Sequence, residues 1–155
     1  MGTPPVKKPI NFEEAFVPVD VLNTYLTESP TKKEIIAAAN VAVYKKSKAK
    51  LIVSDFKKAN PLVRKALAID LTEDKLLDQF SIFTKLNFPK YIIAGDSDPS
   101  INRNYLEGVK DSCQNNGHNG CKIIDLTNCG HFPSIEKPKQ FNKVIRDIAK
   151  DAFQQ

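Results

Sequence analysis

Residues 88–101 read FPKYIIAGDSDPSI, and this stretch decides how the rest of the sequence is interpreted. A short apolar run that is entered through a proline is typical of a β-strand buried on both faces. The run ends at Gly95, and the polar residues Asp96 and Asp98 follow it directly. In open parallel sheets, functional sites lie at the carboxyl ends of the strands. The stretch therefore predicts a strand that delivers an acidic side chain to a site.

A second strand with a polar end is predicted further along the chain. Residues 121–126 (CKIIDL) have the composition of a strand, and the loop after them contains His131. Residues 101–113 suit a helix, which is the crossover that two parallel neighbours need. Neighbouring parallel strands would bring Asp98 and His131 to the same edge of the sheet. A carboxylate that binds one imidazole nitrogen leaves the other nitrogen free to act as a general base.

The distribution of glycine divides the chain into two parts. Gly2 is the only glycine before Gly95, and all the others lie within residues 95–130. Residues 10–80 are therefore expected to form helices joined by turns that proline marks. After the second strand, Pro138 suits the first position of a final helix. A turn-rich loop with an exposed His118 is expected between the two strands.

Start signals locate the helices of the first part. Thr31 and Glu34 have the spacing of a capping box, and the helix that they open is expected to end in the basic run of residues 45–50. Thr72 is expected to cap a later helix. The other predicted elements are a short turn before Pro18, a helix from about Asp20, and helices over 49–58 and 61–69.

Composition excludes several classes of protein. The 155 residues fit about one domain, and no apolar run approaches the ~20 residues that a membrane span needs. The formal charge of +5 is spread evenly along the chain, and only residues 45–50 form a concentrated basic run. We interpret that run as a solvated helix end and not as a nucleic-acid site; contact with RNA or lipid is the weaker alternative. Three cysteines without a signal peptide predict reduced thiols and a cytoplasmic protein. Their spacing lacks a close pair, so no metal site is predicted.

The two strand-end motifs together resemble the α/β-hydrolase superfamily. Residues 88–101 look like the strand and Gly-x-x-Asp turn that deliver the acid of the catalytic triad, and residues 123–145 (IIDLTNCGHFPSIEKPKQFNKVI) look like the last strand, the Gly-His loop and the closing helix. The resemblance covers residues 86–153 and implies that Asp98 is the triad acid and His131 the triad base. Taken singly, the two residues would fit a turn aspartate and a loop histidine. Their order at successive strand ends favours the triad.

The resemblance also implies an organisation for the whole chain. The expected fold class is α/β, a partial α/β-hydrolase fold in which a mostly helical cap segment precedes a βαβα unit with parallel strands. Residues 1–85 would be the helical cap, and residues 86–155 the C-terminal part of the core. The family's nucleophile lies in Gly-x-Ser-x-Gly, but none of the eight serines has a glycine two residues away on both sides. Cys129 lies too close to His131 to take that role.

Two functional hypotheses remain. In the first, the chain is the C-terminal portion of a serine hydrolase with esterase- or lipase-like activity on a small-molecule acyl substrate, inactive without a nucleophile-bearing front half. The cap aromatics Phe12, Phe16, Tyr25 and Phe56 would then cover an apolar acyl group or form the core of the cap. In the alternative, the chain is a truncated, non-catalytic binding or assembly module, which associates with itself or with a front-half chain through an exposed sheet edge.

Overall fold

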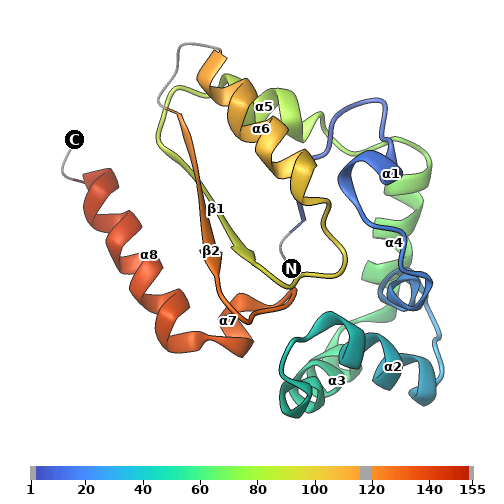
Figure 1. Cartoon of the computed structure of the whole chain (residues 1–155). Coiled ribbons are helices and arrows are strands. Elements are labelled where there is room, and N and C mark those ends of the chain that lie inside the picture. Colours follow the sequence, from blue (N-terminus) through green and yellow to red (C-terminus); the bar gives the residue numbers. More distant parts are fainter. Residues whose placement is uncertain (1–2, 116–119, 154–155) are drawn as a thin grey trace.

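The computed structural model describes residues 3–115 and 120–153, so His118 lies outside the described residues. Two parallel strands, β1 (Lys90–Gly95) and β2 (Cys121–Leu126), form the sheet. Helix α6 (Arg103–Asn115) connects them, and α8 (Pro138–Phe153) flanks the strands on the opposite side (Figure 1). The parallel pairing, the crossover helix and the helical start at Pro138 confirm the predictions from the sequence.

The register of the two strands determines where their loops emerge. Lys90 pairs with Cys121 and Gly95 with Leu126, so both strands end at the same level. The loops that follow therefore leave the sheet side by side. The prediction that β1 is buried on both faces is wrong, because its four central residues are only half-buried. Within the described residues β1 has one neighbouring strand, and its other edge lines a cavity.

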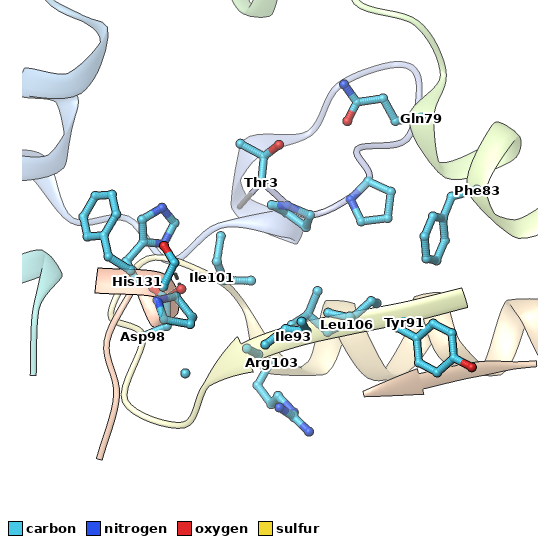
Figure 2. Close-up of a pocket in the computed structure, with 18 of the residues that line it drawn as sticks. Thr3, Gln79, Phe83, Tyr91, Ile93, Asp98, Ile101, Arg103, Leu106 and His131 are labelled. Atoms are coloured by element: carbon cyan, nitrogen blue, oxygen red, sulfur yellow. Dashed lines mark hydrogen bonds and ion pairs between the residues drawn. The ribbon is translucent and has the colours of Figure 1, made fainter. Parts of the chain in front are cut away.

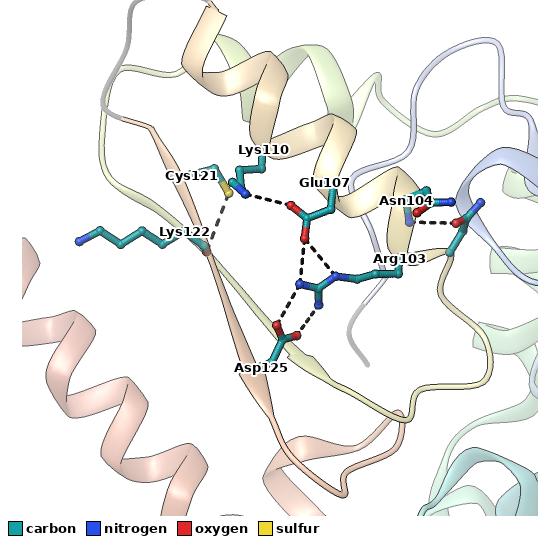
Figure 3. A network of polar contacts seen from close by, with 8 residues as sticks. Arg103, Asn104, Glu107, Lys110, Cys121, Lys122 and Asp125 are labelled. Atoms are coloured by element: carbon teal, nitrogen blue, oxygen red, sulfur yellow. Dashed lines mark hydrogen bonds and ion pairs between the residues drawn. The ribbon is translucent and has the colours of Figure 1, made fainter.

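Salt bridges and hydrogen bonds fasten the helices to the strands. On the α6 side, the guanidinium of Arg103 donates to both Asp125 on β2 and Glu107 on its own helix (Figure 3). On the other side, Asp151 of α8 accepts from the hydroxyl of Tyr91 on β1 and from Lys122 on β2. Most of these side chains are well exposed to solvent, so they contribute modestly to stability and chiefly set the orientation of the helices.

Residues 3–85 are mostly helical, as the sequence predicted. The elements are α1 (Phe12–Ala15), the 3₁₀ helix η1 (Asp20–Leu26), α2 (Lys32–Ala42), the 3₁₀ helix η2 (Lys46–Lys48), α3 (Ala49–Lys58), α4 (Pro61–Thr72) and α5 (Gln79–Lys85). The capping box at α2 is present: the Glu34 amide donates to the Thr31 hydroxyl at 3.2 Å, and the Thr31 amide donates to the Glu34 carboxylate at 2.6 Å. Asn60 caps α4 through the amide of Leu62, which separates α3 from α4.

The expected position of the basic run is wrong. Helix α2 ends at Ala42, before the run begins, and the lysines lie instead in η2 and at the start of α3. A tertiary contact ends α2 early, because the Ala42 carbonyl accepts from the amide of His131 at 2.8 Å. Lys46 alone reaches back to the end of α2, where its ammonium donates to the carbonyl of Val43 at 3.1 Å. That contact is the one the helix dipole favours.

The prediction that Thr72 caps a helix is also wrong. Thr72 is the last residue of α4, and its hydroxyl donates back to the carbonyl of Ala68 at 3.0 Å. The next helix, α5, is capped by Asp78, whose carboxylate accepts from the amide of Ser81 at 2.9 Å. Asp74 takes a left-handed conformation between the two helices (φ 52°), and its carboxylate accepts from the amide of Ile10 at 3.2 Å.

The described residues contain two apolar clusters. The first joins the N-terminal segment to α6 through Val6, Ala15, Tyr105 and Val109. The second joins α2 and α3, and Phe132 and Ile135 from the loop after β2 pack against it. The loop that carries His131 is therefore held between the sheet and the helices of the first half. No helix in the described residues is both long and apolar enough to cross a membrane.

Candidate active site

Two glycines allow the ends of β1 and β2 to meet. A methyl group on Gly95 would lie 2.2 Å from the carbonyl oxygen of Gly130 and 2.4 Å from that of Cys129. A methyl group on Gly130 would lie 2.5 Å from the carbonyl oxygen of Ala42. These distances are too short for any side chain, so both positions require glycine. The loops after the two strands consequently touch, backbone against backbone.

Asp96 and its neighbour tie the two loops together. The carboxylate of Asp96 accepts from the amide of Cys129 at 3.3 Å, and the amide of Ser97 donates to the carbonyl of Cys129 at 2.9 Å. Asn128 precedes Cys129 in a left-handed conformation (φ 52°), which asparagine tolerates better than most residues. The carboxylate of Asp96 accepts from Ser97 and Cys129, so it shapes the loops.

The expected contact between Asp98 and His131 is present. Oδ2 of Asp98 lies 2.8 Å from Nδ1 of His131, and the two side chains are 14% and 13% exposed. Figure 2 shows the pair at one end of a cavity, with Phe83 and Tyr91 toward the other end. The aspartate comes from the loop after β1 and the histidine from the loop after β2, as parallel strands require. Phe132 packs edge-on against the imidazole, with ring centroids 5.1 Å apart.

Ser100 is a member of this cluster that sequence reasoning missed. Its hydroxyl and its amide both donate to Oδ1 of Asp98, at 2.7 and 2.9 Å. The hydroxyl oxygen also lies 3.0 Å from Nδ1 of His131. The spacing Asp-x-Ser is typical of a local turn in which the aspartate accepts from the amide two residues on, and this signal could have identified Ser100.

The hydrogen bonds from His131 and Ser100 lower the pKa of Asp98. Burial by itself would raise the pKa of Asp98, but the hydrogen bond and charge of His131 and the hydrogen bonds from Ser100 outweigh it, so the pKa is lowered. Asp98 is therefore ionised at neutral pH and accepts the proton on Nδ1 of His131. The lone pair of the neutral imidazole is then on Nε2, which has no hydrogen-bond partner among the described residues. That nitrogen can act as a general base.

The same geometry argues against Ser100 as a nucleophile of this histidine. Its proton is donated to Asp98, and the nitrogen nearest to it already carries a proton. Cys129 is also unsuited, because it is fully buried and burial raises the pKa of its thiol to about 11. All three cysteines are free thiols. The described residues contain no cluster of three or more side chains that could bind a metal ion.

His131 lines two cavities at once. The larger has a volume of about 900 Å³ and extends along the open edge of β1, past Ile93 and Tyr91, to α5 and the N-terminal segment. The smaller, about 380 Å³, extends from Ser100 and His131 among α1, η1 and α4. Its walls are mostly apolar, including Phe12, Phe16, Val17, Leu22, Tyr25, Leu26, Leu67 and Leu71. The larger is called the sheet-side cavity and the smaller the helix-side cavity. Because His131 lines both, Asp98 and His131 lie where the two cavities meet.

Comparison with solved structures identifies the fold. The chain matches the N-acyl homoserine lactonase AidH in complex with N-butanoyl homoserine with a TM-score of 0.80 at 16% identity, covering 99% of this chain and 54% of that protein. It matches a protein described as an aryl esterase from Burkholderia cenocepacia with a TM-score of 0.71 at 13% identity (92% and 51% covered). A serine hydrolase from Cycloclasticus zankles gives 0.62 at 15% identity (90% and 53% covered). No protein-family model matches the sequence, and neither does any curated protein.

At these sequence identities the likeness shows the fold alone. The chain has the fold of the α/β-hydrolases, as the two motifs predicted, in a partial form with a helical segment and a two-stranded parallel sheet. It spans about half the length of the solved structures that it matches.

Proposed function

We propose that the chain supplies the acid, the base and the helical cap of a serine hydrolase with esterase- or lipase-like activity. The observation that carries this proposal is the pairing of Asp98 with His131 at 2.8 Å, with Nε2 of His131 unpaired among the described residues, at the meeting point of two cavities. In this proposal residues 1–85 form the cap and residues 86–155 belong to the core. The nucleophile is a serine in a Gly-x-Ser-x-Gly turn that the 155 residues do not contain.

The reaction follows from the hydrogen bond that joins Nδ1 of His131 to Asp98. Nε2 of His131 removes the proton of the serine hydroxyl while the serine oxygen attacks the carbonyl carbon of an ester. Asp98 stabilises the imidazolium, which then gives the proton to the leaving alcohol as the acyl-enzyme forms. Water repeats the sequence on the acyl-enzyme and releases the acid. General acid and base catalysis of this kind contributes about 10²- to 10⁴-fold to the rate.

The apolar walls of the helix-side cavity support the proposal that an apolar acyl or alkyl group of the substrate lies beside His131. Three of the four aromatic residues expected to cover such a group, Phe12, Phe16 and Tyr25, line this cavity. The fourth, Phe56, does not line it and packs in the helical core, where its ring centroid lies 5.9 Å from that of Tyr25. The substrate is thus a small acyl compound with an apolar moiety, and no cofactor, metal or nucleic acid takes part. A cytoplasmic location remains part of the proposal.

The open edge of β1 supports pairing with a front half of the fold. Within the described residues the sheet has only two strands, and so small a sheet is marginal by itself. Along residues 91–95, the edge of β1 that faces away from β2 has no strand partner among the described residues, and such an edge is a template for another strand. A front half that adds parallel strands there would fill the sheet-side cavity and bring its serine to His131. Self-association through the same edge is the alternative, and it would make the chain a non-catalytic assembly module.

A fluorophosphonate probe tests the proposal, because it reacts only with an activated serine. We expect no labelling of the 155-residue chain by itself. A nucleophile-bearing front half, fused ahead of residue 1 or added as a separate chain, should restore labelling. His131→Ala should then abolish labelling, and Asp98→Asn should slow it by about 10⁴-fold.

Two results would contradict the proposal. One is labelling of the chain alone on one of its own serines, for which Ser100→Ala is the diagnostic variant because Ser100 contacts the pair. The other is a folded complex with a front half that stays unlabelled. The assembly module would be favoured by two results together. The isolated chain would form dimers that a charged substitution on the β1 edge disrupts, and it would not be labelled under any condition.

A further inference from the structure

The carboxylate of Glu136 lies directly behind the histidine loop. Glu136 is the last residue of the short helix α7 (Pro133–Glu136), and only 7% of it is exposed. One oxygen accepts from the amides of Gly130 at 3.0 Å and Phe132 at 3.4 Å. The other accepts from the amides of Tyr44 at 2.8 Å and Lys45 at 3.3 Å. Four backbone N–H groups therefore converge on one buried carboxylate.

These four donors come from two distant parts of the chain. Two belong to the loop after β2, and two belong to the segment that follows α2, about 90 residues earlier in the sequence. A carboxylate has about four acceptor positions, so this set satisfies it completely. An ionised side chain is tolerated in a buried place when its hydrogen bonds are satisfied in this way. The arrangement joins the helical segment to the histidine loop through a single side chain.

The contacts of Glu136 bracket His131. Its donors Gly130 and Phe132 are the residues on either side of His131, and the amide of His131 itself donates to Ala42 at the end of α2. Three successive amides of the loop are thus bound. A methyl group on Gly130 would lie 2.9 Å from the Glu136 carboxylate, so the loop has no room to shift toward it. The backbone on which the imidazole stands is held from both sides.

We propose that Glu136 is a positioning residue for His131, which keeps its imidazole aligned with Asp98 by clamping the histidine loop to the end of α2. The catalytic meaning of this role rests on the function proposed above, but the positioning itself does not. It follows that a displacement of the end of α2 is transmitted to the imidazole through Glu136. The helical segment would then influence the base as well as cover the substrate.

Nitrogen NMR of the imidazole in the 155-residue chain tests the proposal. His118 and His131 are the only histidines, so the variant His118→Ala leaves one imidazole to observe. In that background we expect a single His131 tautomer with the proton on Nδ1. Glu136→Gln replaces one acceptor oxygen by an NH₂ group that faces two N–H donors. His131 should then populate both tautomers, and its Nδ1 proton should exchange with solvent about tenfold faster.

Two variants serve as comparisons. Glu28→Gln removes an exposed carboxylate that pairs with Lys65, far from His131 in the sequence, and should leave the imidazole signals unchanged. Glu136→Asp keeps the charge but shortens the side chain, so it should hold only one of the two segments and give an intermediate exchange rate. A folded Glu136→Gln protein with the imidazole signals of the parent would overturn the proposal.

Amide hydrogen exchange of the unmutated chain covers the case in which Glu136→Gln does not fold. If one carboxylate clamps both segments, the amides of residues 44–45 and of Gly130 and Phe132 should exchange at similar rates, because they open together. Rates that differ between the two segments by more than about tenfold would refute the clamp. Neither measurement depends on hydrolysis. A completed enzyme without activity would therefore refute the proposed function and leave this inference standing.

Discussion

At the ends of β1 and β2 the chain packs backbone against backbone, whereas helices α2 and α3 pack against each other through side chains. In the first region, glycines at 95 and 130 let carbonyl groups approach positions where a methyl group would lie within 2.5 Å. In the helical region, residues 3–85, α4 has no buried residue, and most of the large apolar side chains that are exposed in the described structure belong to this part of the chain. Backbone contacts cannot relax by a change of rotamer, but side-chain contacts can.

This contrast predicts which region of the chain tolerates substitution. The site that holds Asp98 and His131 should respond sharply to the addition of a single carbon atom. The helical region should lose stability gradually as side chains are altered. Substitutions in each region test that contrast.

The largest effect is expected from Gly95→Ala. Its new methyl group would meet two carbonyl oxygens of the opposite loop, so the loops must separate at a cost of about 3 kcal/mol or more. Gly108→Ala is the matched control, because nothing lies within 4 Å of the added carbon on helix α6. That variant should be more stable by about 0.5–1 kcal/mol. Urea unfolding measures both, and equal effects at the two positions would remove the basis of the comparison.

Asp98→Asn should come next. The variant loses charge-assisted hydrogen bonds from His131 and Ser100, at a cost of about 2 kcal/mol near neutral pH. The pKa of Asp98 is lowered in the folded protein, so its stabilisation is present above its unfolded value of about 4 and is lost as the pH falls through the lowered value. The stability difference between the two proteins should therefore shrink below about pH 4. Unfolding curves at several pH values check this, and a difference that grows in acid would contradict it.

Arg64→Lys should have a smaller effect, confined to the helical region. The guanidinium of Arg64 donates to the carbonyls of Thr27, Glu28 and Ala59 and lies 4.2 Å from the ring centroid of Phe56. A lysine cannot reproduce this planar set of contacts, and we expect a loss of about 1 kcal/mol. Amide exchange should accelerate in α4, while the NMR signals of His131 stay unchanged. Altered His131 signals would show that the two regions are coupled through α4.

The smallest effect is expected from Leu62→Lys on α4. Leu62 is 60% exposed, so its replacement should change the free energy of unfolding by no more than about 0.5 kcal/mol. Thermal unfolding measures the change. A loss well above that value would mean that the exposed face of α4 is covered in solution, which sedimentation of the parent chain would detect as self-association.

Local patterns in the sequence determined the two strands, the crossover helix, the capping box at Thr31 and the meeting of Asp98 with His131. Each of these depends on residues close together in the chain or on the simple rule that parallel strands end at one edge. The apolar composition of the two strands was enough to predict that they pair. Once two parallel strands pair in register, the loops that follow them leave the sheet at the same edge.

Contacts between distant residues decided the rest. Helix α2 ends at Ala42 because the loop of His131 takes its carbonyl, and no local signal marks that place. Beyond that end, Lys46 and Lys48 lie in η2, and Lys50 lies at the start of α3. Glu136 looks like an ordinary residue of a short helix until the fold brings four amides to its carboxylate. Only the tertiary structure creates such a site, because hydrogen-bond satisfaction of a buried charge depends on which segments the packed chain places around it.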